Sequence, residues 1–322
     1  FGMFFMDFNT DLGITNTEFG LAIGIQMLGW GLSGPIFGAI ADKYGGHKAI
    51  SLAFLFYILG IYFLFAGPNT GIYFQMSLGV LIGIGCGGTA ISIPMSVVGK
   101  HFPLSNRTIA MSIVTAVGSF GYFISPLFTN YSLENNGWVQ TLIYFMIFLI
   151  VGLIVAFFVR SPNLSESLEK PTDQNTLSAL KEAFQTKSYV LLVAGFFVCG
   201  FHITLVGTHV PKYVIDRGLD DWTAAMILSL IGLFNIFGSL LSGYLSTKMS
   251  KKIILSAIYL FRGVSICLFI FTPPSTISSI IFGASFGFLW LSTVPATSGI
   301  VAHIFGTKYL GLLYGLVFLS HQ

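Results

Sequence analysis

The chain is a succession of long apolar runs separated by short polar segments. After an apolar tail over residues 1–8, such runs fall at about 18–41, 49–67, 72–98, 108–130, 138–159, 188–214, 222–246, 253–271, 276–300 and from 309 onward. A helix needs about 20 residues to cross ~30 Å of hydrocarbon. A single run can satisfy its own backbone N–H and C=O groups in lipid only as a helix. The sequence therefore predicts an all-α polytopic membrane protein.

Composition excludes several other classes of protein. Charged residues make up only 8% of the 322 residues, against roughly 25% in a soluble domain. The formal net charge is +3, but the basic residues between the apolar runs form no continuous basic face, which argues against nucleic-acid binding. The three cysteines lie inside apolar runs without paired spacing, so neither a disulfide framework nor a metal site is indicated. We expect no cofactor.

A charged turn between two apolar runs occurs twice. Residues 38–48 read Gly-Ala-Ile-Ala-Asp-Lys-Tyr-Gly-Gly-His-Lys, and residues 243–252 repeat the pattern 205 positions later. Nearly the same offset relates a second pair of motifs, Pro94…His101-Phe102 and Pro295…His303…Phe305. This internal duplication predicts two halves of about six helices each.

The first turn resembles the signature of the major facilitator superfamily, G-x-x-x-D-K-x-G-G-x-K between helices 2 and 3. Three further motifs are similar to the monocarboxylate and oxalate/formate porter branch: Gly79-Val-Leu-Ile-Gly-Ile-Gly85, Gly118-Ser-Phe-Gly121 followed by Pro126, and Cys199-Gly-Phe-His202…Thr208-His209. The resemblance covers nearly the whole chain. It implies a major facilitator fold of two pseudo-symmetric six-helix bundles with a substrate site at their interface.

The polar segment 160–187 is the stretch long enough to link two halves. We expect an N-terminal bundle over residues 1–159 and a C-terminal bundle over 188–322. Within the linker, Leu177–Phe184 has the pattern of a short amphipathic helix at the membrane surface. The chain opens inside an apolar run, and its last run is too short to cross a membrane. We therefore expect a fragment, truncated at both ends, that lacks most of helix 1, the end of helix 11 and helix 12.

The basic residues predict the orientation in the membrane. Loops on the side of the 160–187 linker hold 12 of the 15 Lys and Arg residues. Basic loops face the cytoplasm in multi-pass proteins. We therefore expect the linker to be cytoplasmic and the protein to lie in the inner or plasma membrane.

The first charged turn is a candidate conformational latch, comprising Gly38, Asp42, Lys43, Gly45 and Lys48. A carboxylate at the C-terminal end of helix 2 is disfavoured by the dipole of its own helix and needs an external partner. The resemblance implies the N-terminus of helix 11, near residues 306–309. The alternative is a solvated loop that only enforces topology. In the second copy Thr247 replaces the acid.

Helix 7 carries a stripe of polar side chains. His202, His209 and Tyr213 share one helix face with Val206. The two histidines lie ~10.5 Å apart along the axis, too far to bind one metal ion. Either histidine could exchange a proton during transport, because histidine titrates near neutrality. Alternatively, each could form an interhelical hydrogen bond, and His209 could be exposed to water.

Arg262 is the most costly residue to place, since an arginine at the centre of an apolar run costs about 2.5–3.5 kcal/mol. It should face the protein interior. There it could attract an anionic substrate, or it could bind a buried acid or carbonyl groups; the usual peripheral position of helix 9 favours the structural role. The branch commonly places its substrate-binding arginine in helix 8. Residues 222–246 contain no charge here, and Asn235 is the strongly polar side chain in the middle of that run.

Hydroxyl side chains form stripes on helices 4, 5 and 10. The candidates for a midplane cavity are Thr89, Ser92, Ser119 and Tyr122. Related stripes comprise Ser96 and Thr115 and, on helix 10, Trp290, Thr293 and Thr297. The alternative is a set of interhelical hydrogen bonds worth only ~0.6 kcal/mol each.

The sequence thus predicts a secondary transporter and not an enzyme, since neither paired acids nor histidines one turn apart are visible. The branch resemblance implies a small organic anion, a monocarboxylate, moved with protons or by exchange. The alternatives are a carrier or efflux pump for a neutral or amphiphilic metabolite, and a non-transporting sensor, for which the linker is too short to supply a domain. The expected partners are substrate, H+ and the lipid bilayer, and we expect a monomer.

Overall fold

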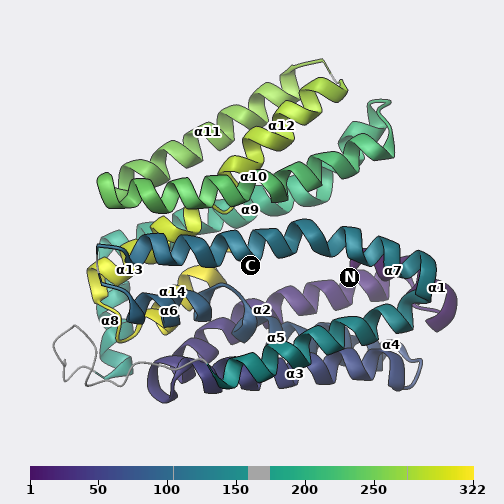
Figure 1. Cartoon of the computed structure of the whole chain (residues 1–322), viewed down its shortest axis with the longest axis horizontal. Helices are drawn as coiled ribbons and strands as arrows, with labels where there is room; N and C mark the ends of the chain where they lie inside the picture. Colours follow the sequence, from purple (N-terminus) through teal and green to yellow (C-terminus); the bar gives the residue numbers. More distant parts are fainter. Residues whose placement is uncertain (104, 159–174, 274) are drawn as a thin grey trace.

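The computed structural model describes residues 1–103, 105–158, 175–273 and 275–322, with no account of the side chains of residues 126 and 221. Every regular element in these ranges is helical (Figure 1). Before the linker the elements are η1 (Gly2–Phe4), α1 (Phe5–Leu12), α2 (Asn16–Tyr44), α3 (Gly46–Ala66), α4 (Gly71–Phe74), the π-helical η2 (Gln75–Leu81), α5 (Ile82–Thr89), α6 (Ser92–His101) and α7 (Arg107–Phe157). From the linker onward they are α8 (Thr176–Gln185), α9 (Lys187–Asp216), α10 (Asp221–Lys248), α11 (Lys251–Phe271), α12 (Thr276–Leu289), α13 (Thr293–Phe305) and α14 (Leu310–Leu319).

Eight helices in the described ranges are long and apolar enough to cross a membrane. One of them, α7, has 51 residues and would span about 77 Å if straight, more than twice the hydrocarbon thickness. It reverses at Gly137, where φ is 76° and ψ is 171°. The two separate runs expected at 108–130 and 138–159 are thus joined by a single glycine in a conformation that other residues rarely adopt. The protein is an all-α polytopic membrane protein.

Two of the expected runs are each interrupted near their middle. Helix α5 ends at Thr89 before α6 begins at Ser92, and α12 ends at Leu289 before α13 begins at Thr293. A proline follows each break, Pro94 in one and Pro295 in the other. Proline lacks an N–H and clashes with the carbonyl four residues earlier, which places the disruption at residues 90 and 291. The two breaks thus repeat the internal duplication.

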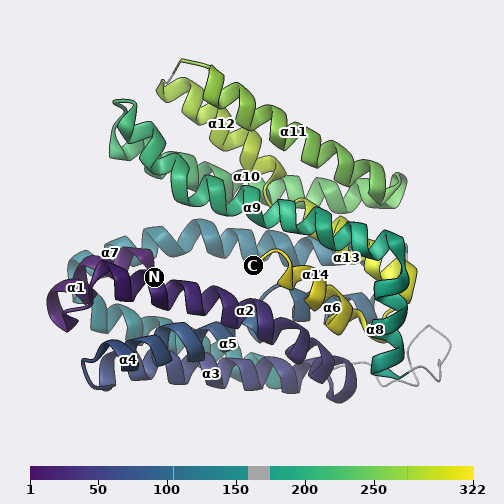
Figure 2. The same ribbon diagram turned by 180° about the vertical axis from the view of Figure 1, so that it is seen from behind.

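Helices from before and after the linker pack against one another most extensively in two pairs, α2 with α14 and α10 with α7. At the end nearest α8, residues of both parts form one apolar core, whose members include Met95, Met111, Tyr189, Val301 and Tyr314. At the opposite end the cores are separate. Both views show the ribbons converging near α8 and α13 and diverging at the other end (Figures 1 and 2). The structure is therefore closed at the linker end.

The short helix α8 covers the stretch expected to be amphipathic, residues 177–184. Ala179 and Ala183 face the protein, while Leu177 and Phe184 are exposed. The remainder of the expected linker before α8, residues 160–174, lies outside the described residues.

Candidate functional site

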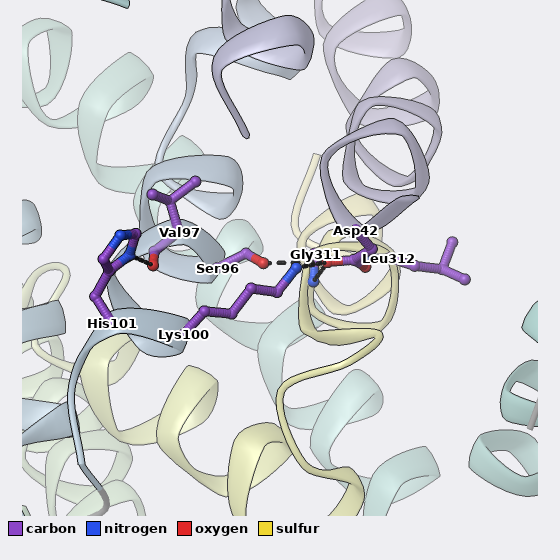
Figure 3. A network of polar contacts seen from close by, with 7 residues as sticks. All are labelled: Asp42, Ser96, Val97, Lys100, His101, Gly311 and Leu312. Carbon is purple, nitrogen blue, oxygen red and sulfur yellow. Dashed lines mark hydrogen bonds and ion pairs between the residues drawn. The ribbon is translucent and has the colours of Figure 1, made fainter. Parts of the chain in front are cut away.

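The first charged turn makes a buried contact with the C-terminal part of the chain (Figure 3). The Asp42 carboxylate is only 3% exposed and accepts hydrogen bonds from the backbone N–H groups of Gly311, at 3.1 Å, and Leu312, at 2.8 Å. Lys100 Nζ lies 2.6 Å from the same carboxylate, and Ser96 donates a hydrogen bond at 3.3 Å. The first turn of a helix presents unpaired N–H groups and the positive end of its dipole. The start of α14 therefore supplies the external partner that Asp42 needs.

Glycines on both helices make this contact possible. A Cβ added to Gly38 would lie 2.2 Å from the Gly311 carbonyl oxygen, and one added to Gly311 would lie 2.8 Å from the Gly38 oxygen. Four residues further along α14, a Cβ at Gly315 would come within 3.0 Å of the Pro35 backbone. Small residues spaced by four allow such close crossings in membranes. Gly311 and Gly315 have that spacing, so the sequence already contained the signal for the partner face.

The structure changes several details of the expected turn contact. The partner groups are the N–H groups of Gly311 and Leu312, not residues 306–309, because the last helix begins at Leu310. Lys43 is exposed and lies over the Tyr44 ring, with its Nζ 5.0 Å from the ring centroid. Lys48 is also exposed, so neither lysine contributes to the Asp42 contact.

Two other residues of this site have clear roles in its geometry. Gly45 has φ 98° and lets the chain reverse between α2 and α3. Lys100 supplies the positive charge that pairs with Asp42, and the sequence reasoning missed it. The signal was its spacing of four from Ser96, which places both residues on one face of α6.

The second copy of the turn repeats the close crossing without the carboxylate. A Cβ at Gly243 would lie 2.2 Å from Ser112 Oγ on α7, so Gly243 plays the packing role of Gly38. Thr247 is exposed, and its hydroxyl donates to the Tyr244 carbonyl of its own helix at 2.7 Å. In the described residues, the buried acid contact thus belongs to the first copy alone.

Arg262 lies fully buried on α11 and donates to the end of α12. Its Nε and Nη2 both donate to the Leu289 carbonyl, at 3.0 and 2.7 Å, and Nη2 also donates to the Trp290 carbonyl. Its Nη1 donates to Cys199 Sγ on α9 at 3.0 Å, and that sulfur lies 3.3 Å from Thr293 Oγ1. Arg262 therefore satisfies carbonyl groups that the break before Thr293 leaves without a helical donor.

Two polar residues of α10 serve the same break. Asn235 Oδ1 accepts from the Leu291 N–H at 2.8 Å, and Ser242 Oγ donates to the Ser292 carbonyl at 2.6 Å. Asn235 also reaches the other half of the chain, because its Nδ2 donates to Ser119 Oγ on α7 at 2.6 Å. Of the predicted site residues, Asn235 and Ser119 are thus brought into direct contact across the two halves.

The predicted stripe on α9 spans three different environments. His202 is partly buried, and its Nδ1 has no hydrogen-bond partner among the described residues. His209 is exposed. Tyr213 is partly buried, and its hydroxyl lies 3.5 Å from the Ile270 carbonyl. His202, three residues after the Arg262 ligand Cys199, is the histidine of this stripe that lies nearest the buried polar network.

The remaining predicted residues lie on α5, α6 and α7. The Thr89 hydroxyl donates to the Gly85 carbonyl at 2.9 Å, within its own helix. Tyr122 is 48% exposed and lies beside Gly232 of α10. A Cβ added at Gly232 would lie 3.4 Å from the Tyr122 ring. Ser92 is buried, and its Oγ has no hydrogen-bond partner among the described residues.

Other buried polar atoms that lack a hydrogen-bond partner in the described part of the chain include Trp30 Nε1, Thr297 Oγ1 and Tyr314 OH. Trp30 and Tyr314 pack in the apolar core shared by both halves, and Ser92 and Thr297 lie on helices that border it. Buried polar groups are normally hydrogen-bonded. Four unpaired groups around one core therefore mark it as a candidate binding region. Trp30 and Tyr314 were missed because a single polar-tipped ring in an apolar run has no distinguishing pattern.

Comparisons with known proteins are consistent along the whole chain. The model of the Major Facilitator Superfamily matches residues 1–322. The sialic acid transporter NanX of Escherichia coli (strain K12) is 25% identical over 313 residues, which cover 96% of this chain and 75% of the relative. Monocarboxylate transporter 6 of Mus musculus is 27% identical over 297 residues, which cover 82% and 61%. The solved structure of the E. coli fucose:proton symporter FucP aligns with a TM-score of 0.77 at 15% identity, over 95% of this chain and 82% of that one.

Proposed function

The chain belongs to the major facilitator superfamily and is a secondary transporter, and from that premise we propose that it carries a small organic anion, a monocarboxylate, with protons or by exchange. The similarity to a monocarboxylate transporter and a sialic acid transporter supports an acidic substrate. We further propose that residues 1–159 and 188–322 move as two bundles about a site between them. The 160–187 linker would face the cytoplasm, in the inner or plasma membrane.

The buried charge of Arg262 carries the anion proposal. Its side chain is 0% exposed, and no carboxylate among the described residues forms an ion pair with it. A buried positive charge without a carboxylate favours an anion nearby, because Coulomb interactions are weakly screened in the protein interior. Since its N–H groups bind carbonyls and Cys199, we expect Arg262 to attract the substrate through its field. Trp30, Ser92, Thr297 and Tyr314 would then supply direct hydrogen bonds.

The transport reaction needs two states, and the structure supplies contacts for one of them. The Asp42 contact with α14 and the apolar core around Met95 and Met111 hold the linker end closed. Opening that end must break the hydrogen bonds from the N–H groups of Gly311 and Leu312 to the Asp42 carboxylate. We propose that Asp42 acts as a latch on the linker-closed state.

Uptake by the purified transporter in proteoliposomes tests the substrate class. We expect an imposed inward proton gradient to drive accumulation of labelled lactate, pyruvate, acetate or oxalate above the level of empty liposomes. An exchanger would instead take up labelled acid only when the liposomes contain unlabelled acid that can leave in exchange. The anion proposal is wrong if correctly folded protein shows neither gradient-driven uptake nor exchange for any of these acids.

Of the two histidines on α9, we propose that His202 couples transport to protons. Its Nδ1 has no hydrogen-bond partner among the described residues, and it lies three residues after Cys199, which binds Arg262, whereas His209 is exposed. We expect His202→Gln to abolish pH-driven accumulation while retaining exchange at equal pH, because exchange needs no net proton movement. His209→Gln, the matched control on the same helix, should keep both activities. Intact pH-driven accumulation in the His202 variant would show that coupling lies elsewhere.

A carrier or efflux pump for a neutral or amphiphilic metabolite is the second candidate. Helix α10 has no charge over residues 222–246, and both polar groups of Asn235 are bonded within the protein. The structural neighbour FucP is a fucose:proton symporter. Uptake of labelled fucose with no uptake of the four acids would favour this candidate.

A further inference from the structure

A cavity of about 650 Å³ lies between the linker-end parts of α9, α11 and α13. All of its lining residues belong to the part of the chain after the linker, between residues 188 and 304. It is therefore separate from the contacts between the two halves. Neither the latch nor the Arg262 network accounts for it.

The polar end of this cavity is positively charged. Lys251, Lys252 and His303 line it together with hydroxyl groups, and none of the described residues that line it is acidic. Lys251 is partly buried, and its stem runs under Gly299, where an added Cβ would lie 2.9 Å from Cε. The absence of a side chain at Gly299 thus leaves room for this lysine. The first turn of α11, which begins at Lys251, adds the positive end of a helix dipole.

The other side of the cavity is apolar and opens toward the outer surface of the bundle. Leu191, Leu255, Ile300 and Ile304 line it, and Leu191 is 61% exposed while Ile304 is 37% exposed. These residues belong to membrane-crossing helices, so their exposed faces meet lipid chains. A ligand that fits must combine an anionic group at the membrane boundary with an apolar tail along the helices.

We propose that this cavity binds an anionic glycerophospholipid of the leaflet on the linker side. The headgroup phosphate lies between Lys251 and Lys252, and one acyl chain follows the apolar side toward Leu255 and Ile300. Basic pockets between membrane helices on the cytoplasmic side bind the headgroups of anionic lipids in this way. Free phosphate is also an anion but leaves the apolar side empty, which is why the lipid is the assigned ligand. The site does not depend on which substrate is transported.

Thermal unfolding of the purified protein in detergent tests this site. We expect phosphatidylglycerol to raise the unfolding midpoint saturably, while phosphatidylcholine and inorganic phosphate do not. Lys251→Gln with Lys252→Gln should raise the half-saturating lipid concentration roughly twenty-five-fold, about fivefold for each lysine. Lys212→Gln with Arg217→Gln is the matched control, since it removes two positive charges at exposed positions, one on α9 and one directly after it, outside the cavity.

Three results would overturn the proposal. Equal stabilisation by phosphatidylcholine would show that any lipid stabilises the protein in detergent. Equal stabilisation by inorganic phosphate would show a site that binds anions without an acyl chain. An unchanged half-saturating concentration in the double variant would place lipid binding elsewhere. Should the double variant unfold without lipid, Lys252→Gln alone decides, because Lys252 is exposed and its replacement leaves the packing of Lys251 intact. For this single variant we expect a half-saturating lipid concentration about fivefold higher than that of the parent protein.

Discussion

Asp42→Asn is expected to shift the transporter toward the state that is open at the linker end. In the proposed two-bundle movement, Lys100 and Ser96 stay in the same bundle as Asp42, so we expect their bonds not to bias the equilibrium. The N–H groups of Gly311 and Leu312 lie in the other proposed bundle, so we expect their hydrogen bonds to Asp42 to be lost on opening. Hydrogen bonds to a charged acceptor contribute about 1.5–3 kcal/mol each, against roughly 0.5–1.5 for a neutral one. We therefore expect a shift of about 2 kcal/mol, or roughly thirtyfold.

Cysteine accessibility measures this shift. Ser298 is fully buried in the closed linker end, with its Oγ 3.3 Å from Met111 Sδ, so Ser298→Cys reports opening. Labelling by an impermeant thiol reagent from the linker side should be faster with Asp42→Asn, in a background where the exposed Cys267 is serine. Asp216→Asn is the matched control, because it removes an acid from an exposed ion pair with Lys212. Equal labelling rates in parent and Asp42 variant would exclude the latch.

The fold was predictable because lipid leaves a chain few choices. Runs of 20 or more apolar residues must become helices, so the crossings follow from length alone. The breaks within individual helices are harder to predict from the sequence. Pro94 and Pro295 interrupt their helices, but Pro35 and Pro211 lie within α2 and α9, which continue through them. Whether a proline ends a helix depends on neighbours that satisfy the freed carbonyl, and no local pattern reports those neighbours.

The candidate site was predictable where one helix determines it. Asp42 at a helix end signals its need for a donor, and Arg262 in an apolar run signals burial. The partners were less accessible, because Lys100, Gly311 and Leu312 become neighbours of Asp42 only when α2, α6 and α14 pack together. The stripe on α9 shows a different limit of a sequence pattern. A shared face does not imply a shared environment, since a helix of 30 residues crosses from one membrane boundary to the other.

Arg262→Met is expected to destabilise the protein by about 2–5 kcal/mol and to lower the midpoint of thermal unfolding in detergent. Removing the guanidinium leaves the Leu289 and Trp290 carbonyls without a donor in an apolar interior. Each bond to a charged donor contributes about 1.5–3 kcal/mol, and the lost bonds together exceed the roughly 2.5–3.5 kcal/mol that burying an arginine costs. Arg217→Met, which removes an exposed arginine stacked on Tyr213, should leave the midpoint nearly unchanged.

Arg262→Lys separates the charge of this residue from its hydrogen bonds. A lysine keeps the positive charge but cannot reproduce the fork that reaches Leu289, Trp290 and Cys199 together. If the buried charge attracts the anionic substrate, folded Arg262→Lys protein keeps an uptake KM near that of the parent, while the folded fraction of Arg262→Met shows a KM raised about tenfold, equivalent to about 1.4 kcal/mol. An unaltered KM in both variants, with a lower unfolding midpoint, would make Arg262 a purely structural support of the α12–α13 break. The anion would then have to be recognised by the unpaired groups of Trp30, Ser92, Thr297 and Tyr314.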